Sequence, residues 1–382
     1  MGSGLAAVRE SLRQNRTGLS DEAWFDCDLD TWLGRVKILD TSADAAVDVL
    51  APEWQSRNNR LAKLGIQTEN FSNQVAAAAD RFGADRIGLA LGTSTSSIGR
   101  SEEGYRNLDT DNRFPASFRQ PQVHNPHALG AYLQHLLGIC GPAGTISTAC
   151  SSSAKAFGTA ARWLELGLAD AVVVGGVDSL CQSIIYGFNS LQLIDPQLCR
   201  PFDQHRGGIN LGEAAGFVLL SREPLNDSGA RLLGYGESSD AHHMSSAHPD
   251  GLGAKLAMHA AINRSGRDLA ELDYVNLHGT GTRANDAIES RVCQSLLSAD
   301  TLASSTKGWT GHTLGAAGIC EAILTIDAIN TGVVPGNINT TEAIAEILPQ
   351  LLTATTTHTV RLAMSNSFGF GGNNCSLVFG AA

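Results

Sequence analysis

Short apolar runs alternate with longer helix-like stretches along most of this chain. Several of the runs lack the polar alternation of a half-exposed strand, and they cover residues 87–91, 144–148, 171–174, 217–220, 274–277 and 378–379. Runs of this kind are typical of strands that are buried on both faces beneath helices. The pattern therefore predicts an α/β fold.

Two of the stretches between these runs have the spacing of a helix. In residues 151–168, apolar side chains recur every three or four positions from Ala154 to Leu168 and form one face. Residues 314–330 predict a second helix, which a Thr-Gly pair would end. Each helix follows a strand and a tight turn, which indicates a faint internal repeat.

Composition and charge exclude some classes of function. The chain has 382 residues with 43% hydrophobic side chains, and its formal net charge is −11. An acidic balance argues against a general nucleic-acid binder, which would carry a basic face. The first twenty residues are charged and have no signal-peptide core, and no uncharged apolar run approaches the length of a membrane span. We expect a cytoplasmic protein without membrane insertion.

The eight cysteines are scattered and include no CxxC pair, so neither a zinc site nor a disulfide framework is indicated. Most of them are best interpreted as small buried hydrophobic residues. Cys150 differs, because it stands at a predicted strand-to-helix turn and is followed by three serines. Free backbone N–H groups and the positive end of the helix dipole would favour its thiolate form, which is the nucleophile.

Two histidines lie in further glycine-rich segments. His278 directly follows the buried strand at 274–277, at the strand end where α/β folds place ligands. His312 stands near a predicted helix start, five residues after Lys307. Glu321 lies on that helix among apolar residues, so it needs a cationic partner, and Lys307 is the candidate.

The last segment, residues 365–374, reads SNSFGFGGNN. Its glycines flank Phe370, so the turn could move or present a backbone N–H to a reacting oxygen. A simple Gly-rich turn before the final strand is the alternative interpretation.

Together, TACSSS at 148–153, HGTGT at 278–282, KxxxGHxxxAAGxxE at 307–321 and NSFGFGGNN at 366–374 resemble the β-ketoacyl-acyl-carrier-protein synthases. These are condensing enzymes of the thiolase superfamily, and the resemblance is to the elongating branch. It implies a five-layered αβαβα fold with two similar halves fused in one unit. Residues 1–220 would carry the cysteine and residues 221–382 the two histidines.

The resemblance also implies roles for single residues. Cys150 would receive the acyl chain as a thioester, while His278 and His312 would promote decarboxylation of malonyl-acyl-carrier protein and stabilise the enolate. Lys307, with Glu321, would orient the site electrostatically.

Four further positions follow from the same motifs. The N–H groups of Cys150 and Phe370 would form an oxyanion hole, with Phe370 as a gate and Phe368 in support. Thr280 and Thr282 would contact the pantetheine arm.

Partners and cofactors follow from the family as well. The substrates would be carried on the phosphopantetheine of an acyl carrier protein, and the enzyme itself would need no cofactor and no metal. His242, His243 and His248 could suggest a metal site, but the family has a loop there. We expect a homodimer, or a heterodimer with a related ketosynthase-like subunit, in fatty-acid, polyene or type II polyketide biosynthesis.

One departure from the family concerns the N-terminus, because the family has a core strand before the segment that resembles residues 2–9. We therefore expect the first strand of the fold to be absent from this sequence. Alternative functions are a non-catalytic chain-length-factor-like subunit, an initiating synthase or thiolase, and a cysteine hydrolase. Retention of Cys150, His278 and His312 favours the active elongating synthase over all of these.

Overall fold

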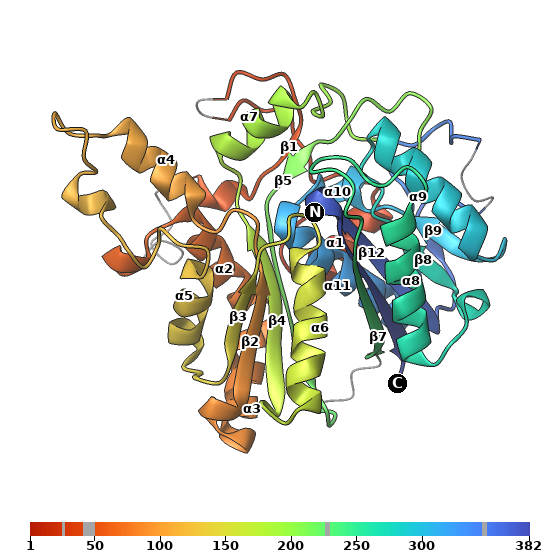
Figure 1. Ribbon diagram of the computed structural model, residues 1–382, viewed down its shortest axis with the longest axis horizontal. Helices are drawn as coiled ribbons and strands as arrows, with labels where there is room; N and C mark the ends of the chain where they lie inside the picture. Colours follow the sequence, from red (N-terminus) through yellow and green to blue (C-terminus); the bar gives the residue numbers. More distant parts are fainter. Residues whose placement is uncertain (25–26, 41–49, 226–229, 346–349) are drawn as a thin grey trace.

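The computed structural model describes residues 1–24, 27–40, 50–225, 230–345 and 350–382 (Figure 1). Two mixed β-sheets form its frame. The first has the order β3-β2-β4-β6 and consists of Ala143–Ile146, Ile87–Gly92, Ala171–Asp178 and Ala214–Ser221. Its strands are parallel except for β6, which runs antiparallel to β4.

The second sheet repeats this pattern with one additional strand. Its order is β7-β13-β12-β8-β9, formed by Ala230–Ser239, Asn373–Ala381, Leu362–Gly369, Tyr274–Asn276 and Leu302–Ser304. Strands β9, β8, β12 and β13 correspond in order and direction to β3, β2, β4 and β6. The predicted internal repeat is therefore confirmed at the level of topology.

Two helices lie between the sheets. They are α6 (Ser152–Glu165), which follows β3, and α11 (Ala317–Thr331), which follows β9 through a short helical turn. Each contacts the other and strands of both sheets, because alanine and glycine on their inner faces allow close approach. The apolar core here includes Phe157, Ile319 and Phe379.

The outer faces of both sheets are covered by further helices. Helices α2 (Arg57–Gln67), α3 (Phe71–Phe82) and α5 (Ala128–Leu137) cover the first sheet, and α8 (Leu252–Ser265) and α9 (Arg283–Leu296) cover the second (Figure 1). The predicted five-layered α/β fold is thus confirmed. The remaining elements are α1 (Gly4–Arg13), α4 (Ile98–Arg106), α7 (Gln182–Ser190), α10 (Lys307–Thr310) and the short strands β1 (Leu33–Gly34), β5 (Leu211–Gly212), β10 (Val333–Val334) and β11 (Thr356–Thr357).

The first sheet has four strands where the second has five. Within the described residues, β6 pairs only with β4, whereas its counterpart β13 lies between β12 and β7. Most side chains of β6 are accordingly only half-buried, while those of β13 are almost all buried. The strand expected to be absent at the start of the fold is the counterpart of β7. The division at residue 220 stays a prediction, although β6 ends at Ser221 and β7 begins at Ala230.

Residues 314–331 have the length and hydropathy of a membrane span, with a mean hydropathy of 1.3, in contrast to the sequence-based expectation. Two thirds of this stretch is buried inside the protein, where α11 packs between the sheets. Such burial is typical of the core helix of a globular protein.

Glycines in the second sheet allow the outer helix α8 to approach closely. A Cβ atom at Gly236 of β7 would lie 2.0 Å from the carbonyl oxygen of Ala257 and 2.5 Å from the backbone nitrogen of Ala261. Both atoms belong to the α8 backbone, which cannot rotate away as a side chain can.

We expect Gly236→Ala to lower the free energy of unfolding by about 1–3 kcal/mol or more, the usual cost of overpacking. Gly187→Ala is the control, because a Cβ there meets nothing within 4 Å and alanine favours the α7 helix by about 0.5–1 kcal/mol. Denaturant unfolding of both variants measures the difference. Equal stability of Gly236→Ala and the wild type would contradict the close helix–sheet packing.

Candidate active site

Cys150 occupies the turn between β3 and α6. Its residue is 6% exposed, and the preceding Ala149 has a φ of 53°, which is uncommon for a residue with a side chain. The hydroxyl of Ser152 donates to the carbonyl oxygen of Ala149 at 2.6 Å and helps to hold this turn. The turn places the cysteine at the amino end of a buried helix.

His278 follows β8 and is 1% exposed. The Nζ atom of Lys307 lies 3.3 Å from its Nδ1 and also donates to its carbonyl oxygen. Because a lysine ammonium can only donate, Nδ1 must accept, and the proton of the neutral ring is then on Nε2.

His312 lies in the turn between α10 and α11 and is 2% exposed. The backbone N–H of Leu314 donates to its Nδ1 at 3.0 Å, which again leaves the proton on Nε2. Leu314 adopts a φ of 57° in this turn. The helix predicted from residue 314 begins with a 3₁₀ turn at Leu314–Ala316, and the α-helix α11 starts only at Ala317. Leu314, the first residue of the 3₁₀ turn, has a left-handed backbone and cannot belong to the α-helix.

These three side chains converge. The Cys150 thiol and ring nitrogens of His278 and His312 all lie within 4.8 Å of one another, and the two rings are nearly perpendicular with centroids 5.7 Å apart. Burial, followed by the charge of Lys307, lowers the pKa of His278 well below its usual range. The same causes lower the pKa of His312 to about 3, so both rings are neutral donors at physiological pH.

The Cys150 thiol differs from the sequence-based expectation of a favoured thiolate. Burial raises its pKa to about 11, although Lys307 and the backbone N–H groups of Phe370 and Cys150 act in the opposite direction. The turn does supply the expected stabilising groups. Their effect is smaller than the cost of placing a charge in a buried site, so the resting cysteine is a thiol.

Lys307 and Glu321 form the predicted ion pair, with the two side chains 1% and 3% exposed. Burial raises the pKa of Glu321, and the charge of Lys307 opposes this shift. Removal of either partner alone would leave an uncompensated buried charge. The pair connects α10 to the central helix α11 and holds the ammonium group beside His278.

The glycine-rich segment is a hairpin rather than a simple turn, because β12 runs to Gly369 and β13 begins at Asn373. The N–H of Phe370 faces the Cys150 sulfur, as does the N–H of Cys150 itself. A Cβ at Gly369 would lie 3.3 Å from the Cys150 nitrogen, so glycine permits this approach. Two backbone donors therefore lie beside the thiol, which is where an oxyanion hole would need them.

The two phenylalanines of this hairpin lie beside different rings of the site. The Phe370 ring is half-buried and lies 5.7 Å from the Phe188 ring, while the Phe368 ring lies 6.0 Å from that of His278. A gating role for Phe370 stays a prediction. Gly371, with a φ of 74°, supplies backbone freedom next to it.

Thr280 and Thr282 extend from the His278 loop. Their hydroxyl groups are 2.9 Å apart, and Thr282 also caps α9 by accepting the N–H of Asn285. The cap gives Thr282 a structural role that the sequence analysis missed. Contact of either threonine with pantetheine stays a prediction.

Comparison with known proteins agrees with this geometry. Residues 42–225 match the family described as beta-ketoacyl synthase, N-terminal domain, and residues 229–341 match its C-terminal domain. The chain belongs to the β-ketoacyl synthase family. It is a condensing enzyme of the acyltransferase class.

Two curated relatives are similar over most of their length. A 3-oxoacyl-[acyl-carrier-protein] synthase 2 from Synechocystis is 31% identical, over 99% of this chain and 94% of that protein. One from Vibrio cholerae is 37% identical, over 78% and 76%. Among solved structures, the ketosynthase ApeO in complex with its chain length factor ApeC from Xenorhabdus doucetiae is 41% identical, covering 89% and 86%, with a TM-score of 0.81.

The donors of this ketosynthase site could in principle hold a metal ion, because cysteine and histidine are ordinary zinc ligands. A metal at Nε2 would require the proton to move to Nδ1. Both Nδ1 atoms already accept hydrogen bonds, from Lys307 and Leu314, and a cation stands beside His278. The residues therefore do not fit a metal ion, and the absence of a catalytic metal stays a prediction.

The histidine-rich loop at 240–250 supports the oxyanion hairpin. The carbonyl oxygen of Met244 accepts the N–H of Gly371, and the N–H of Asp240 donates to Gly372. The rings of His242 and His248 are 5.2 Å apart. Among the described residues, this loop forms no cluster suited to a metal.

Three residues near the site were missed by sequence reasoning. Phe188 packs against His312 and Phe370, and Glu289 accepts the N–H groups of His278 and Gly279, each at 2.8 Å. Asp178 ends strand β4 and is fully buried. Asp178 is a carboxylate at the end of an apolar run, which is a signal that could have identified it, whereas Glu289 stands among polar residues and carries no such signal.

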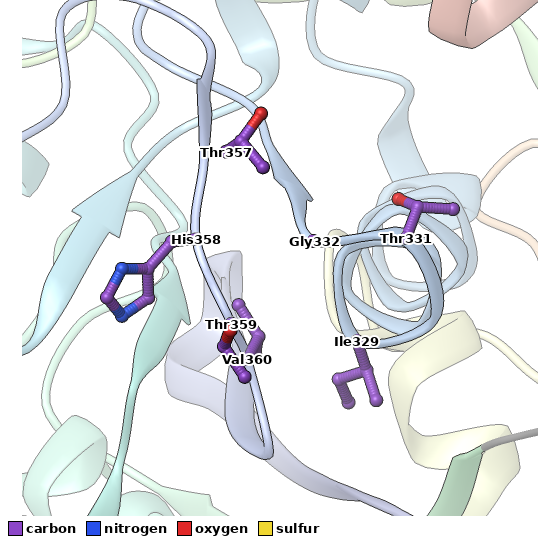
Figure 2. A pocket seen from close by; sticks show the side chains of 7 residues that line it. All are labelled: Ile329, Thr331, Gly332, Thr357, His358, Thr359 and Val360. Carbon is purple, nitrogen blue, oxygen red and sulfur yellow. The ribbon is translucent and has the colours of Figure 1, made fainter.

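A shallow pocket of about 340 Å³ lies away from these residues, at the end of α11. Figure 2 shows it between Ile329, Thr331 and the segment at 357–360, with the His358 ring directed away from the helix. Its lining offers no grouping of acid, base and nucleophile. It is separate from the ketosynthase site.

The raised pKa of Cys150 predicts how the free enzyme reacts with iodoacetamide. Because only the thiolate reacts, the alkylation rate should rise about tenfold per pH unit from pH 7 to 10 without a plateau. The small thiol N-acetylcysteine, measured in parallel, should level off above its pKa, near the ordinary cysteine value of about 8.5. Peptide mapping by mass spectrometry isolates the signal of Cys150, and a plateau below pH 9 would contradict the assignment.

Proposed function

We propose that this chain catalyses the decarboxylative Claisen condensation of an acyl chain bound to Cys150 with malonyl-acyl-carrier protein. The observation that carries the proposal is the convergence of one thiol, two histidine Nε2–H donors and two backbone N–H donors. A hydrolase would need a base beside its nucleophile. Both histidines here are held as donors, which suits stabilisation of an enolate.

In the first half-reaction, the Cys150 sulfur attacks the carrier thioester carbonyl. The carrier's phosphopantetheine sulfur leaves and takes the cysteine proton, so the exchange of one thiol for another is neutral overall. The N–H groups of Cys150 and Phe370 stabilise the tetrahedral oxyanion.

In the second half-reaction, the malonyl group loses CO2 and leaves an enolate on the carrier thioester. The Nε2–H groups of His278 and His312 donate to its oxygen, where charge develops. The enolate carbon attacks the Cys150 thioester, forms the new C–C bond and expels the cysteine thiolate, which is then protonated. The Lys307–Glu321 pair keeps His278 in the donor tautomer.

Substitutions should separate the role of Cys150 in acylation from the role of the two histidines in decarboxylation. We expect Cys150→Ala to lose both the acyl adduct and condensation, yet still to decarboxylate malonyl-acyl-carrier protein, because the histidines remain. His278→Ala and His312→Ala should form the adduct but lower decarboxylation by about a hundredfold or more, as when other oxyanion donors are removed.

Intact-mass spectrometry of enzyme and carrier protein follows both half-reactions. Cys140→Ala is the control, since Cys140 is an exposed cysteine that lies outside the converging groups. Unchanged condensation by Cys150→Ala would refute the assignment of the nucleophile.

We propose that the functional unit is a heterodimer with a ketosynthase-like subunit of the chain-length-factor type. The similarity to ApeO, which forms a complex with ApeC, supports this choice over a homodimer. Co-expression with such a subunit should yield a 1:1 complex in analytical ultracentrifugation. A stable homodimer that excludes the second subunit would contradict it.

A further inference from the structure

Asp178 is a buried carboxylate between the two halves of the active site. It ends strand β4 and is 0% exposed. Its two oxygens accept hydrogen bonds from one loop of the first half and from one turn of the second half. The donors are the hydroxyls of Thr93 and Thr95 at 2.6 and 2.8 Å and the backbone N–H groups of Ser94, Thr95 and Gly315 at 2.8, 3.0 and 2.6 Å.

One branch of this network reaches the nucleophile. Asp178 fixes the backbone of Ser94, and the hydroxyl of Ser94 donates to the carbonyl oxygen of Ala149 at 3.2 Å. That carbonyl belongs to the same peptide plane as the N–H of Cys150, because a peptide bond is planar. Together with the Ser152 hydroxyl, which donates to the same carbonyl at 2.6 Å, the contact helps to set the direction of an oxyanion-hole donor, next to an alanine held at a φ of 53°.

The other branch reaches His312. The N–H of Gly315, which bonds to Asp178, belongs to the peptide plane that follows Leu314. The N–H of Leu314 in turn donates to the Nδ1 of His312. Leu314 has a φ of 57°, a left-handed conformation that is costly for a bulky residue and persists only where the surroundings fix it.

We propose that Asp178 is a positioning residue. It fixes the N–H of Cys150, which is an oxyanion-hole donor, and the ring of His312 relative to each other across the two halves. This inference rests on the proposed condensation reaction. The carboxylate bonds directly to the turn that contains Leu314 and His312, and it reaches the turn that contains Ala149 and Cys150 through Ser94. A neutral amide cannot replace it, because its NH2 group would face backbone N–H donors that need an acceptor.

The experiment compares Asp178→Asn with the wild type in the two half-reactions, per folded molecule. We expect acylation of Cys150 and decarboxylation of malonyl-acyl-carrier protein each to fall about tenfold or more, since small misplacements of reacting groups can cost up to about a hundredfold. The change should appear mainly in kcat, because the carrier-binding surface is untouched. Asp178→Glu, which keeps the charge, should recover part of both rates.

Asp273→Asn is the matched control. Asp273 also accepts backbone N–H groups, from Arg361 and Leu362, but it precedes β8 at the end of the strand opposite His278. The Asp273→Asn variant should have a lower free energy of unfolding than the wild type, with unchanged rates of acylation and decarboxylation. If Asp178→Asn keeps both rates within twofold of the wild type, the positioning role is refuted.

Two further variants apply even if Asp178→Asn does not fold. Ser94→Ala removes the hydroxyl that reaches Ala149, so it tests that branch alone and should slow acylation while sparing decarboxylation. Gly315→Ala places a methyl group 2.7 Å from an Asp178 oxygen and 2.7 Å from the Ser94 nitrogen, so it disturbs both branches and should slow both half-reactions. A Ser94→Ala variant that slows both half-reactions equally, or a Gly315→Ala variant that slows neither, would overturn the two-branch arrangement.

A wild-type enzyme that forms neither acyl adduct nor decarboxylation product, even when co-expressed with its ketosynthase-like subunit, would refute the proposed function instead. The positioning role is then tested by crystal structures of the wild type and Asp178→Asn. Loss of the left-handed φ at Leu314 or Ala149 in the variant supports it. Retention of both angles and of the Leu314–His312 hydrogen bond refutes it.

Discussion

The buried ammonium group of Lys307 is the constraint on which the rest of this active site depends. It lies at the start of α10, pairs with Glu321 on α11 and contacts His278, so one cation joins three elements. Its charge lowers the pKa of both histidines and opposes the rise in the pKa of Cys150. Burial is the larger cause of all three pKa shifts, and it keeps the site as two neutral donors around a thiol even though Lys307 favours the thiolate. The cost of burying the cation is offset because Glu321 is buried with it.

The internal repeat explains why the reacting groups meet. Cys150 follows β3 and His312 follows β9, and these strands occupy corresponding positions in the two sheets. The helices that come next, α6 and α11, contact each other between the sheets, which brings both turns to the same end of the molecule. Asp178 connects these turns, directly to Gly315 in the His312 turn and through Ser94 to Ala149 in the Cys150 turn, so their geometries are linked by one group.

Much of the fold and of the site could be predicted from the sequence. Buried strands such as β2 and β4 are continuous apolar runs, and the helix at 152–165 has a clear apolar face, so local pattern was sufficient. Strands β7 and β12 were not predicted, because glycine and polar residues interrupt them and pairing with distant strands, β13 for both and also β8 for β12, makes them strands. The candidate site residues from Cys150 to Glu321 could be predicted as well, because each lies in a short motif that is visible along the sequence.

The sequence by itself determined the residue types, their order and the two-half α/β pattern, because these follow from periodicity and motifs along the chain. Only the tertiary structure decided the protonation of the site. A helix terminus favours a thiolate at Cys150, yet burial among residues distant in sequence outweighs it and raises the pKa to about 11. The histidine tautomers and the role of Asp178 likewise depend on donors from other segments, since the solvation and hydrogen bonds of a group are set by whatever the fold places around it.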